Sequence, residues 1–230
     1  MTKVSAFLPC RKGSERIPRK NIKPFAGIEH GLIAIKLRQL LGAAHIDTVH
    51  LSTNDDEILD FAATLDSDKI VPHKRCEELS SSATSTDDLV AHALELIGSD
   101  RHIMWTHVTS PFVNATLYDE MIKTYFTKHG EGYDSLMSTN AIHGFLWNEE
   151  GPVNYDRQKE KWPRTQTLSP IHEINSAAFI ATSSVYSDHS DRIGDRPFKF
   201  GMNKIVGMDI DWPEDFVLGE LMVSAGLVTL

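Results

Sequence analysis

The sequence predicts an α/β fold with a mainly parallel sheet and helices on both faces. Short apolar runs, typical of buried strands, alternate with segments whose apolar residues recur at helical spacing from Val4 to Gly130. Strands that alternate with helices of this length usually pair in parallel. Because the sequence has no internal repeat, low-complexity segment or linker, we expect residues 1–230 to form a single domain.

The first half of the chain contains most of the expected elements. Strands are expected at residues 4–8, 48–52, 70–71 and 102–107, and helices at 31–44, 86–97 and 117–129. A further helix follows the second strand, where Asn54 is the expected cap and three acidic residues occupy the first turn that the helix dipole favours.

The alternation stops after the helix at 117–129. Residues 140–175 are rich in polar, glycine and proline residues without a clear period, and we expect an insertion or long functional loop there. Strand character resumes at 177–180. A late strand is expected at 204–210, followed by a final helix at 213–223 that opens with Pro213.

Composition narrows the class of function. A formal net charge of -9 argues against general nucleic-acid binding, because such proteins usually carry a net basic face. Two cysteines, Cys10 and Cys76, are too few for a disulfide framework and fit a reduced cytoplasmic setting. No stretch approaches the roughly 20 apolar residues that span a bilayer, and the early run VSAFL is too short for a signal peptide. We therefore expect a cytoplasmic protein without nucleic-acid or membrane partners.

One segment runs against this acidic composition. Residues 9–27, PCRKGSERIPRKNIKPFAG, follow the first strand and form what we call the basic loop. Like charges repel, so gathering them destabilises the protein unless an anion joins them. The cations are Arg11, Lys12, Arg16, Arg19, Lys20 and Lys23, opposed only by Glu15.

The position of the basic loop indicates a ligand. In doubly wound sheets, ligands bind outside the carboxyl ends of the strands, and Gly13 allows the backbone to approach one closely. We interpret the loop as a polyphosphate site, although it matches neither GxxxxGK[ST] nor GxGxxG. The alternative is a solvated basic surface loop.

A second signal lies near the other end of the chain, in MDIDWPEDF at residues 208–216. On a strand, Asp209 and Asp211 face the same side, about 6.5 Å apart along the chain. Such carboxylates repel unless a cation lies between them, and Mg²⁺ typically takes one or two carboxylates plus phosphate oxygens and waters. The acidic pair therefore predicts a Mg²⁺ site. The alternative is two exposed aspartates, one of which caps the next helix.

These motifs together resemble the CMP-sialic acid synthetases, or acylneuraminate cytidylyltransferases. LSTNDDEI, ELSSSATSTDDLVAHALE, VTSPF and MDIDWPEDF resemble family motifs in the same order, so that the resemblance spans nearly the whole chain. The N-terminal signature is matched by Arg11, Gly13, Ser14, Pro18, Lys20 and Asn21.

The resemblance implies a three-layer nucleotidyltransferase fold with a Rossmann-like sheet, and a protruding dimerisation segment near residues 140–175 that makes a homodimer. It implies transfer of CMP from CTP to the anomeric hydroxyl of a 2-keto-3-deoxy acid sugar, with release of pyrophosphate. The implied catalytic residues are Arg11 and Lys20, which would hold the triphosphate, and Asp209 and Asp211, which would hold Mg²⁺. The implied nucleotide-binding residues are Arg11, Gly13, Ser14, Lys20, Asn21, Arg75 and Ser85.

Two departures from the family leave the sugar open. His107 stands where the family usually has a glutamine that faces the sugar, and the alternative role is a structural hydrogen bond at a strand end. Glu173, two residues before Asn175, stands where members often carry a second arginine. Arg164 is the candidate for the substrate carboxylate, or alternatively for a dimer-interface salt bridge. We expect His107, Arg164 and Asn175 to contact the substrate.

Sialic, legionaminic, pseudaminic and octulosonic acids are all open as substrates. The first alternative function is therefore a CMP-octulosonic acid synthetase of the Kdo type. The second is a non-catalytic nucleotide-sugar binding protein of the same fold. The combination of Arg11, Lys20, Asp209 and Asp211 argues against the second, because binding alone does not require the whole metal and phosphate set.

Overall fold

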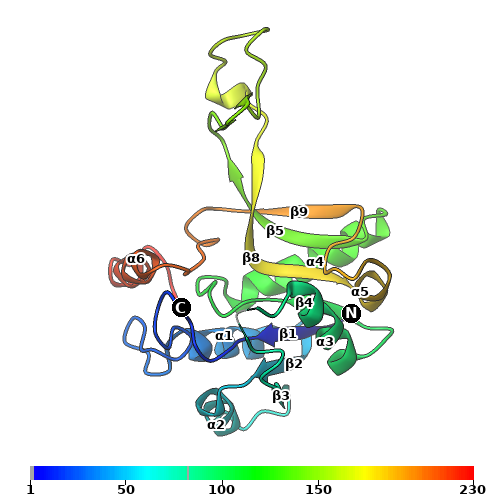
Figure 1. Cartoon of the computed structure of the whole chain (residues 1–230), viewed down its shortest axis with the longest axis vertical. Coiled ribbons are helices and arrows are strands. Elements are labelled where there is room, and N and C mark those ends of the chain that lie inside the picture. Colours follow the sequence, from blue (N-terminus) through cyan, green and yellow to red (C-terminus); the bar gives the residue numbers. More distant parts are fainter. Residues whose placement is uncertain (1–2, 82) are drawn as a thin grey trace.

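A seven-stranded sheet with helices on both faces forms the body of the protein (Figure 1). The computed structural model describes residues 3–81 and 83–230. The sheet strands are β1 (Val4–Pro9), β2 (Ile46–Thr53), β3 (Ile70–Lys74), β4 (His102–Trp105), β5 (Ser135–Ile142), β8 (Ile171–Thr182) and β9 (Pro197–Met202). The helices are α1 (Gly31–Gly42), α2 (Asp56–Thr64), α3 (Thr86–Ile97), α4 (Ala115–Gly130), α5 (Ser183–His189) and α6 (Pro213–Ser224).

The strand order β3-β2-β1-β4-β8-β5-β9 confirms the predicted mainly parallel α/β sheet. Only β8 runs antiparallel to its neighbours, β4 and β5. After β1 the chain forms β2 and β3 on one side and then crosses to β4 on the other side. Such a reversal leaves a crevice outside the carboxyl ends of the two strands, and the basic loop follows β1 into that position.

Successive side chains of a strand point to opposite faces of the sheet, so that the core is divided between these two faces. In β1, Ala6 and Leu8 join the cluster beneath α1, α2, α4 and α6, whereas Phe7 joins the cluster beneath α3 and α5. Residues two apart on a strand face the same side. The central strands are thus buried on both faces, as their nearly continuous apolar sequences predict.

The predicted insertion is a projecting arm. β5 and β8 remain paired out to Ile142 and Ile171, and residues 143–170 between them form the arm, which extends away from the body (Figure 1). It contains the short hairpin β6 (Trp147–Asn148) and β7 (Gly151–Pro152) and the 3₁₀ helix η1 (Thr165–Thr167). The ends of the predicted range, 140–142 and 171–175, belong instead to β5 and β8.

Two element predictions are wrong. Residues 204–210 form turns rather than a strand, because the Asn203 side chain accepts hydrogen bonds from the backbone of Ile205 and Val206. The acidic pair therefore lies on an irregular segment. Asp55, not Asn54, caps α2. Among the described residues, the longest helix is too short and too polar to cross a membrane.

Candidate active site

The basic loop is held to the end of β1 by contacts with other elements. Asn54, displaced from its predicted role as a cap, accepts a hydrogen bond from the backbone N–H of Lys12 at 2.9 Å. The Asn21 side chain donates to the carbonyl of Arg11 at 3.1 Å, and its own carbonyl accepts from Ile33 at the start of α1. These contacts fix the loop against the end of β2 and the start of α1.

A cavity of about 290 Å³ lies between the basic loop and the segment after β4. It brings together five of the residues predicted from the sequence. The lining residues are Pro9, Cys10, Arg11, Ser14, Glu15, Arg16, Lys20, Asn21, His107, Val108 and Thr109.

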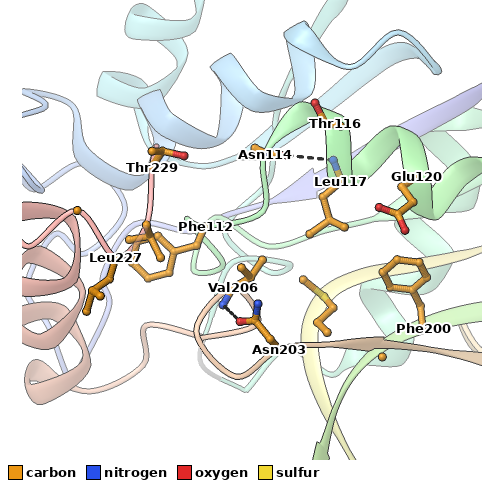
Figure 2. Close-up of a pocket in the computed structure, with 14 residues that line it drawn as sticks. Phe112, Asn114, Thr116, Leu117, Glu120, Phe200, Asn203, Val206, Leu227 and Thr229 are labelled. Carbon is orange, nitrogen blue, oxygen red and sulfur yellow. Dashed lines mark hydrogen bonds between the residues drawn. The ribbon is translucent and has the colours of Figure 1, made fainter.

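A larger cavity, of about 650 Å³, lies between the start of α4, β9 and residues 226–229 (Figure 2). Phe112, Phe200 and Val206 contribute to its wall, and Glu120 is the one titratable group among the described residues that line it. A polyphosphate needs cations, which this wall lacks. The smaller cavity is therefore the candidate active site.

Lys20 joins the basic loop to the acidic pair. Its buried Nζ donates to the carbonyl of Ile210 at 2.8 Å and to Oδ1 of Asp211 at 2.9 Å. Nη1 of Arg16 lies 3.5 Å from the other carboxylate oxygen of Asp211. Burial opposes ionisation of Asp211, yet the hydrogen bond and charge of Lys20 and the charge of Arg16 hold its pKa below the usual value. Asp211 is thus ionised, and Lys20 and Arg16 compensate its negative charge.

The pKa of Asp209 is shifted in the opposite direction from that of Asp211. Its Oδ1 is buried and has no hydrogen-bond partner among the described residues. Burial raises the pKa of the carboxyl and the charge of Asp211 adds to this shift, whereas the Thr109 side chain and the charge of Lys20 oppose it. The carbonyl of Thr109 also accepts from the backbone of Ile210 at 2.8 Å, which fixes the acidic pair against the segment after β4.

The acidic pair fits a hard divalent cation. An orphaned carboxylate oxygen beside a second carboxylate is the kind of donor that Mg²⁺ binds, with phosphate oxygens and waters completing the shell. Within residues 3–81 and 83–230, no group of three or more His, Cys, Asp or Glu side chains is placed to hold a metal alone. The site thus suits a metal that arrives with a phosphate ligand.

His107 lines the cavity as a neutral hydrogen-bond donor. Nε1 of Trp105 donates to its Nε2 at 2.8 Å, and because an indole only donates, the imidazole proton lies on Nδ1. Burial and the nearby charge of Arg192 lower the pKa of His107 to about 3. The ring therefore keeps a structural contact and still offers one N–H to a ligand.

The segment after β4 rests on a buried lysine that the sequence analysis missed. Nζ of Lys36 in α1 donates to the carbonyl of Ser110 at 2.7 Å and to the hydroxyl of Tyr118 at 2.5 Å. Burial lowers the pKa of Lys36 to about 7, against the opposing charge of Asp209. The signal in the sequence was a lysine inside the apolar run GLIAIKLRQLL.

Three predicted nucleotide residues do not line the cavity. Arg75 is buried behind the basic loop, where it donates to the carbonyl of Cys10 at 3.0 Å and to the hydroxyl of Ser80. Ser85 is exposed and caps α3 through the backbone N–H of Asp88. Gly13 lies in the loop with a φ of 84°, a conformation that favours glycine, and faces open space.

Two predicted substrate residues also lie elsewhere in the chain. Arg164 is exposed on the arm, which extends away from the body (Figure 1). Asn175 is buried in β8, where its side chain donates to Oδ1 of Asn140 at 2.9 Å and accepts from the backbone of Ala177. Within one chain, the structure does not bring either residue to the cavity.

Comparisons with known proteins show the family and the fold of the chain. A family model described as cytidylyltransferase matches residues 6–201. The chain is 24% identical to a pseudaminic acid cytidylyltransferase of Campylobacter jejuni, over 94% of both chains. It is 27% identical to N-acylneuraminate cytidylyltransferase B of Danio rerio, over 91% of this chain and 49% of that protein. A CMP:2-keto-3-deoxy-manno-octonic acid synthetase complexed with CTP shares the fold, with a TM-score of 0.66, 14% identity and coverage of 98% and 100%.

The two carboxylates should affect stability in opposite directions. Because the folded state raises the pKa of Asp209, ionisation at pH 7 disfavours folding, and Asp209→Asn should raise the unfolding midpoint by roughly 2–4 °C, or about 1 kcal/mol. Because the folded state lowers the pKa of Asp211, Asp211→Asn should lower the midpoint, by less than this amount because water screens the half-exposed carboxylate, and leave Lys20 buried without its counter-charge. Thermal unfolding in EDTA without nucleotide measures both. A destabilised Asp209→Asn variant would contradict the unpaired state of this carboxylate.

Proposed function

The chain belongs to the cytidylyltransferase family, and we propose that it transfers CMP from CTP to the anomeric hydroxyl of a 2-keto-3-deoxy acid sugar. The observation that carries the proposal is the contact of Lys20 with Asp211, which joins the basic loop to the acidic pair. A loop of cations and a metal-binding pair are the two parts that nucleotidyl transfer requires. Relatives named for pseudaminic acid and N-acylneuraminate support a nonulosonic acid as the acceptor.

In the proposed reaction, the anomeric oxygen attacks the α-phosphorus of CTP as the bond to the β-phosphate oxygen breaks. The hydroxyl proton is released, and pyrophosphate leaves with the bonding electron pair. Negative charge grows on the phosphate oxygens, so that positioned cations stabilise the transition state. We assign this role to Arg11 and Lys20, which both line the cavity. Ser14 and Asn21 orient the nucleotide, and His107 donates Nδ1–H to the sugar.

We further propose that Asp209 and Asp211 hold Mg²⁺. When bound, Mg²⁺ neutralises phosphate charge and lowers the pKa of the attacking hydroxyl. The buried, unpartnered oxygen of Asp209 supports this role. Asp211 already faces Lys20 and Arg16, so that these side chains orient its carboxylate toward the ligand. The unpaired thiols of Cys10 and Cys76 support a reduced, cytoplasmic setting.

We also propose that the protein forms a homodimer through contacts of the arm. Three apolar side chains on it are more than half exposed, namely Trp147 (51%), Val153 (51%) and Trp162 (67%). Exposed aromatic residues on a projecting segment are typical of interfaces. Arg164 on the arm then contacts the partner subunit, either at its active site or in an interface ion pair.

Pyrophosphate release tests the proposed reaction. With CTP and Mg²⁺, we expect release with one of the sialic, legionaminic, pseudaminic or octulosonic acids, and little release with UTP or ATP. Arg11→Ala should reduce kcat/KM by roughly 10²-fold or more, because it removes a cation from the transition state. Lys23→Met is the matched control, since Lys23 belongs to the basic loop but does not line the cavity. Normal kinetics in Arg11→Ala, or silence across the panel in a protein that binds CTP, would contradict the proposal.

Sedimentation analysis tests the homodimer. We expect a dimer at micromolar concentration that Trp162→Ser converts to monomer, since the variant removes the most exposed aromatic side chain of the arm. Leu221→Ser is the control, because Leu221 is similarly exposed (58%) but lies on α6. A monomeric wild-type protein, or equal dissociation in both variants, would overturn this assignment.

A further inference from the structure

A cation without an acidic partner lies beside the candidate active site. Arg192, between α5 and β9, places its guanidinium carbon 3.9 Å from the ring centroid of Phe179 and 4.8 Å from that of Trp105. None of the hydrogen bonds or ion pairs found among the described residues involves its side chain. Burial lowers its pKa, but a guanidinium stays charged at any physiological pH. Two aromatic rings and the more distant charge of Asp191 compensate the guanidinium only in part, because it has no hydrogen bond or ion pair among the described residues, and such partial burial is costly.

The position of this cation connects it to His107. Trp105 and Phe179 are cross-strand partners on β4 and β8, and the indole of Trp105 donates to His107 at the cavity wall. Among nearby charges, Arg192 has the largest effect on His107. The guanidinium thus stacks on the ring that contacts His107, next to the cavity wall, although Arg192 is not one of the residues that line the cavity.

Three hydrogen-bond donors gather there, and one acid, Asp191, is near enough for its charge to act on Arg192 and Tyr186. Beside Arg192 and His107, Tyr186 of α5 is buried, and its hydroxyl has no partner among the described residues. Arg192 exerts the largest charge effect on this hydroxyl, so that the two groups are neighbours. A cluster of donors in which no carboxylate is ion-paired with the guanidinium is complementary to an anion, and the guanidinium fork matches a carboxylate in particular.

Packing alone does not explain this arrangement. Arg196 provides a comparison within the chain, because its guanidinium also stacks on a ring, Tyr133, at 4.8 Å. Arg196 is exposed to water, and its Nη1 donates to the carbonyl of Gly132. Arg192 is only partly exposed and has neither kind of compensation. Arg192 as a residue is partly exposed, so that the protein does not enclose it completely.

We propose that Arg192 binds the carboxylate of the acidic sugar, on the His107 side of the cavity. This inference rests on the proposed function and assigns a substrate-binding residue to it. It also accounts for a departure noted in the sequence, because Glu173 stands where an arginine was expected and Arg192 supplies a cation from a different element. The triphosphate then binds to cations of the basic loop, and the sugar carboxylate binds to Arg192.

Kinetics of Arg192→Gln test this assignment. The KM for the acid sugar should rise roughly tenfold or more, because a hydrogen bond to a charged group is lost, while the KM for CTP stays within about twofold. Arg192→Lys keeps the charge but loses the forked guanidinium, so that its KM for the acid sugar should lie between those of the wild-type protein and Arg192→Gln. Arg196→Gln is the matched control and should leave both constants unchanged. An unchanged sugar KM in Arg192→Gln would overturn the inference.

A substrate analogue separates carboxylate binding from a general structural effect. The wild-type protein should discriminate the acid from its carboxamide, and Arg192→Gln should lose most of this discrimination. Equal discrimination in both proteins would place the carboxylate elsewhere and overturn the inference. If the wild-type protein turns over an acid sugar while Arg192→Gln is normal, only this inference fails. If the wild-type protein neither turns over nor binds any of the four acids in calorimetry, the proposed function fails and this inference fails with it.

Discussion

The buried ammonium of Lys20 is the contact on which the candidate site depends. Its two hydrogen bonds join segments 190 and 191 residues apart in the sequence, the basic loop and the acidic pair. Burying an ammonium is unfavourable unless its hydrogen bonds and a counter-charge compensate it, and Ile210 and Asp211 supply both. The contact therefore brings together the residues that we propose to bind phosphate and metal, within the free protein.

The two carboxylates of the acidic pair differ in how well their neighbours compensate them. Asp211 forms ion pairs with two cations, whereas the buried Oδ1 of Asp209 has no hydrogen-bond partner among the described residues, although the charges of Lys20 and Lys36 act on this carboxyl. Arg192 shows the opposite imbalance, a cation without an anion, near His107. Each imbalance destabilises the free protein, and each is relieved by a ligand of a specific charge. Natural proteins commonly accept such local conflicts at functional sites.

Local signals in the sequence predicted most of the fold and part of the site. The alternation of β1, α1 and β2 depends on short-range periodicity, and the charges of the basic loop are contiguous. The strand expected at 204–210 failed because Asn203 captures backbone N–H groups that a strand would use for pairing. The roles of Lys36 and Arg192 depend on tertiary contacts that no local pattern encodes, although a lysine within an apolar run gave one hint. Ser85 and Asn175, which were expected to contact ligands, instead form hydrogen bonds within the protein.

The most direct test of the account is the Mg²⁺ dependence of CTP binding, measured by calorimetry with Mg²⁺ and with EDTA. Mg²⁺ should tighten CTP binding to the wild-type protein by roughly tenfold or more, or about 1.4 kcal/mol. In Asp209→Asn this enhancement should disappear, while binding in EDTA stays as tight as in the wild-type protein or becomes tighter. An equal enhancement by Mg²⁺ in both proteins would contradict the assignment of the acidic pair as the metal site.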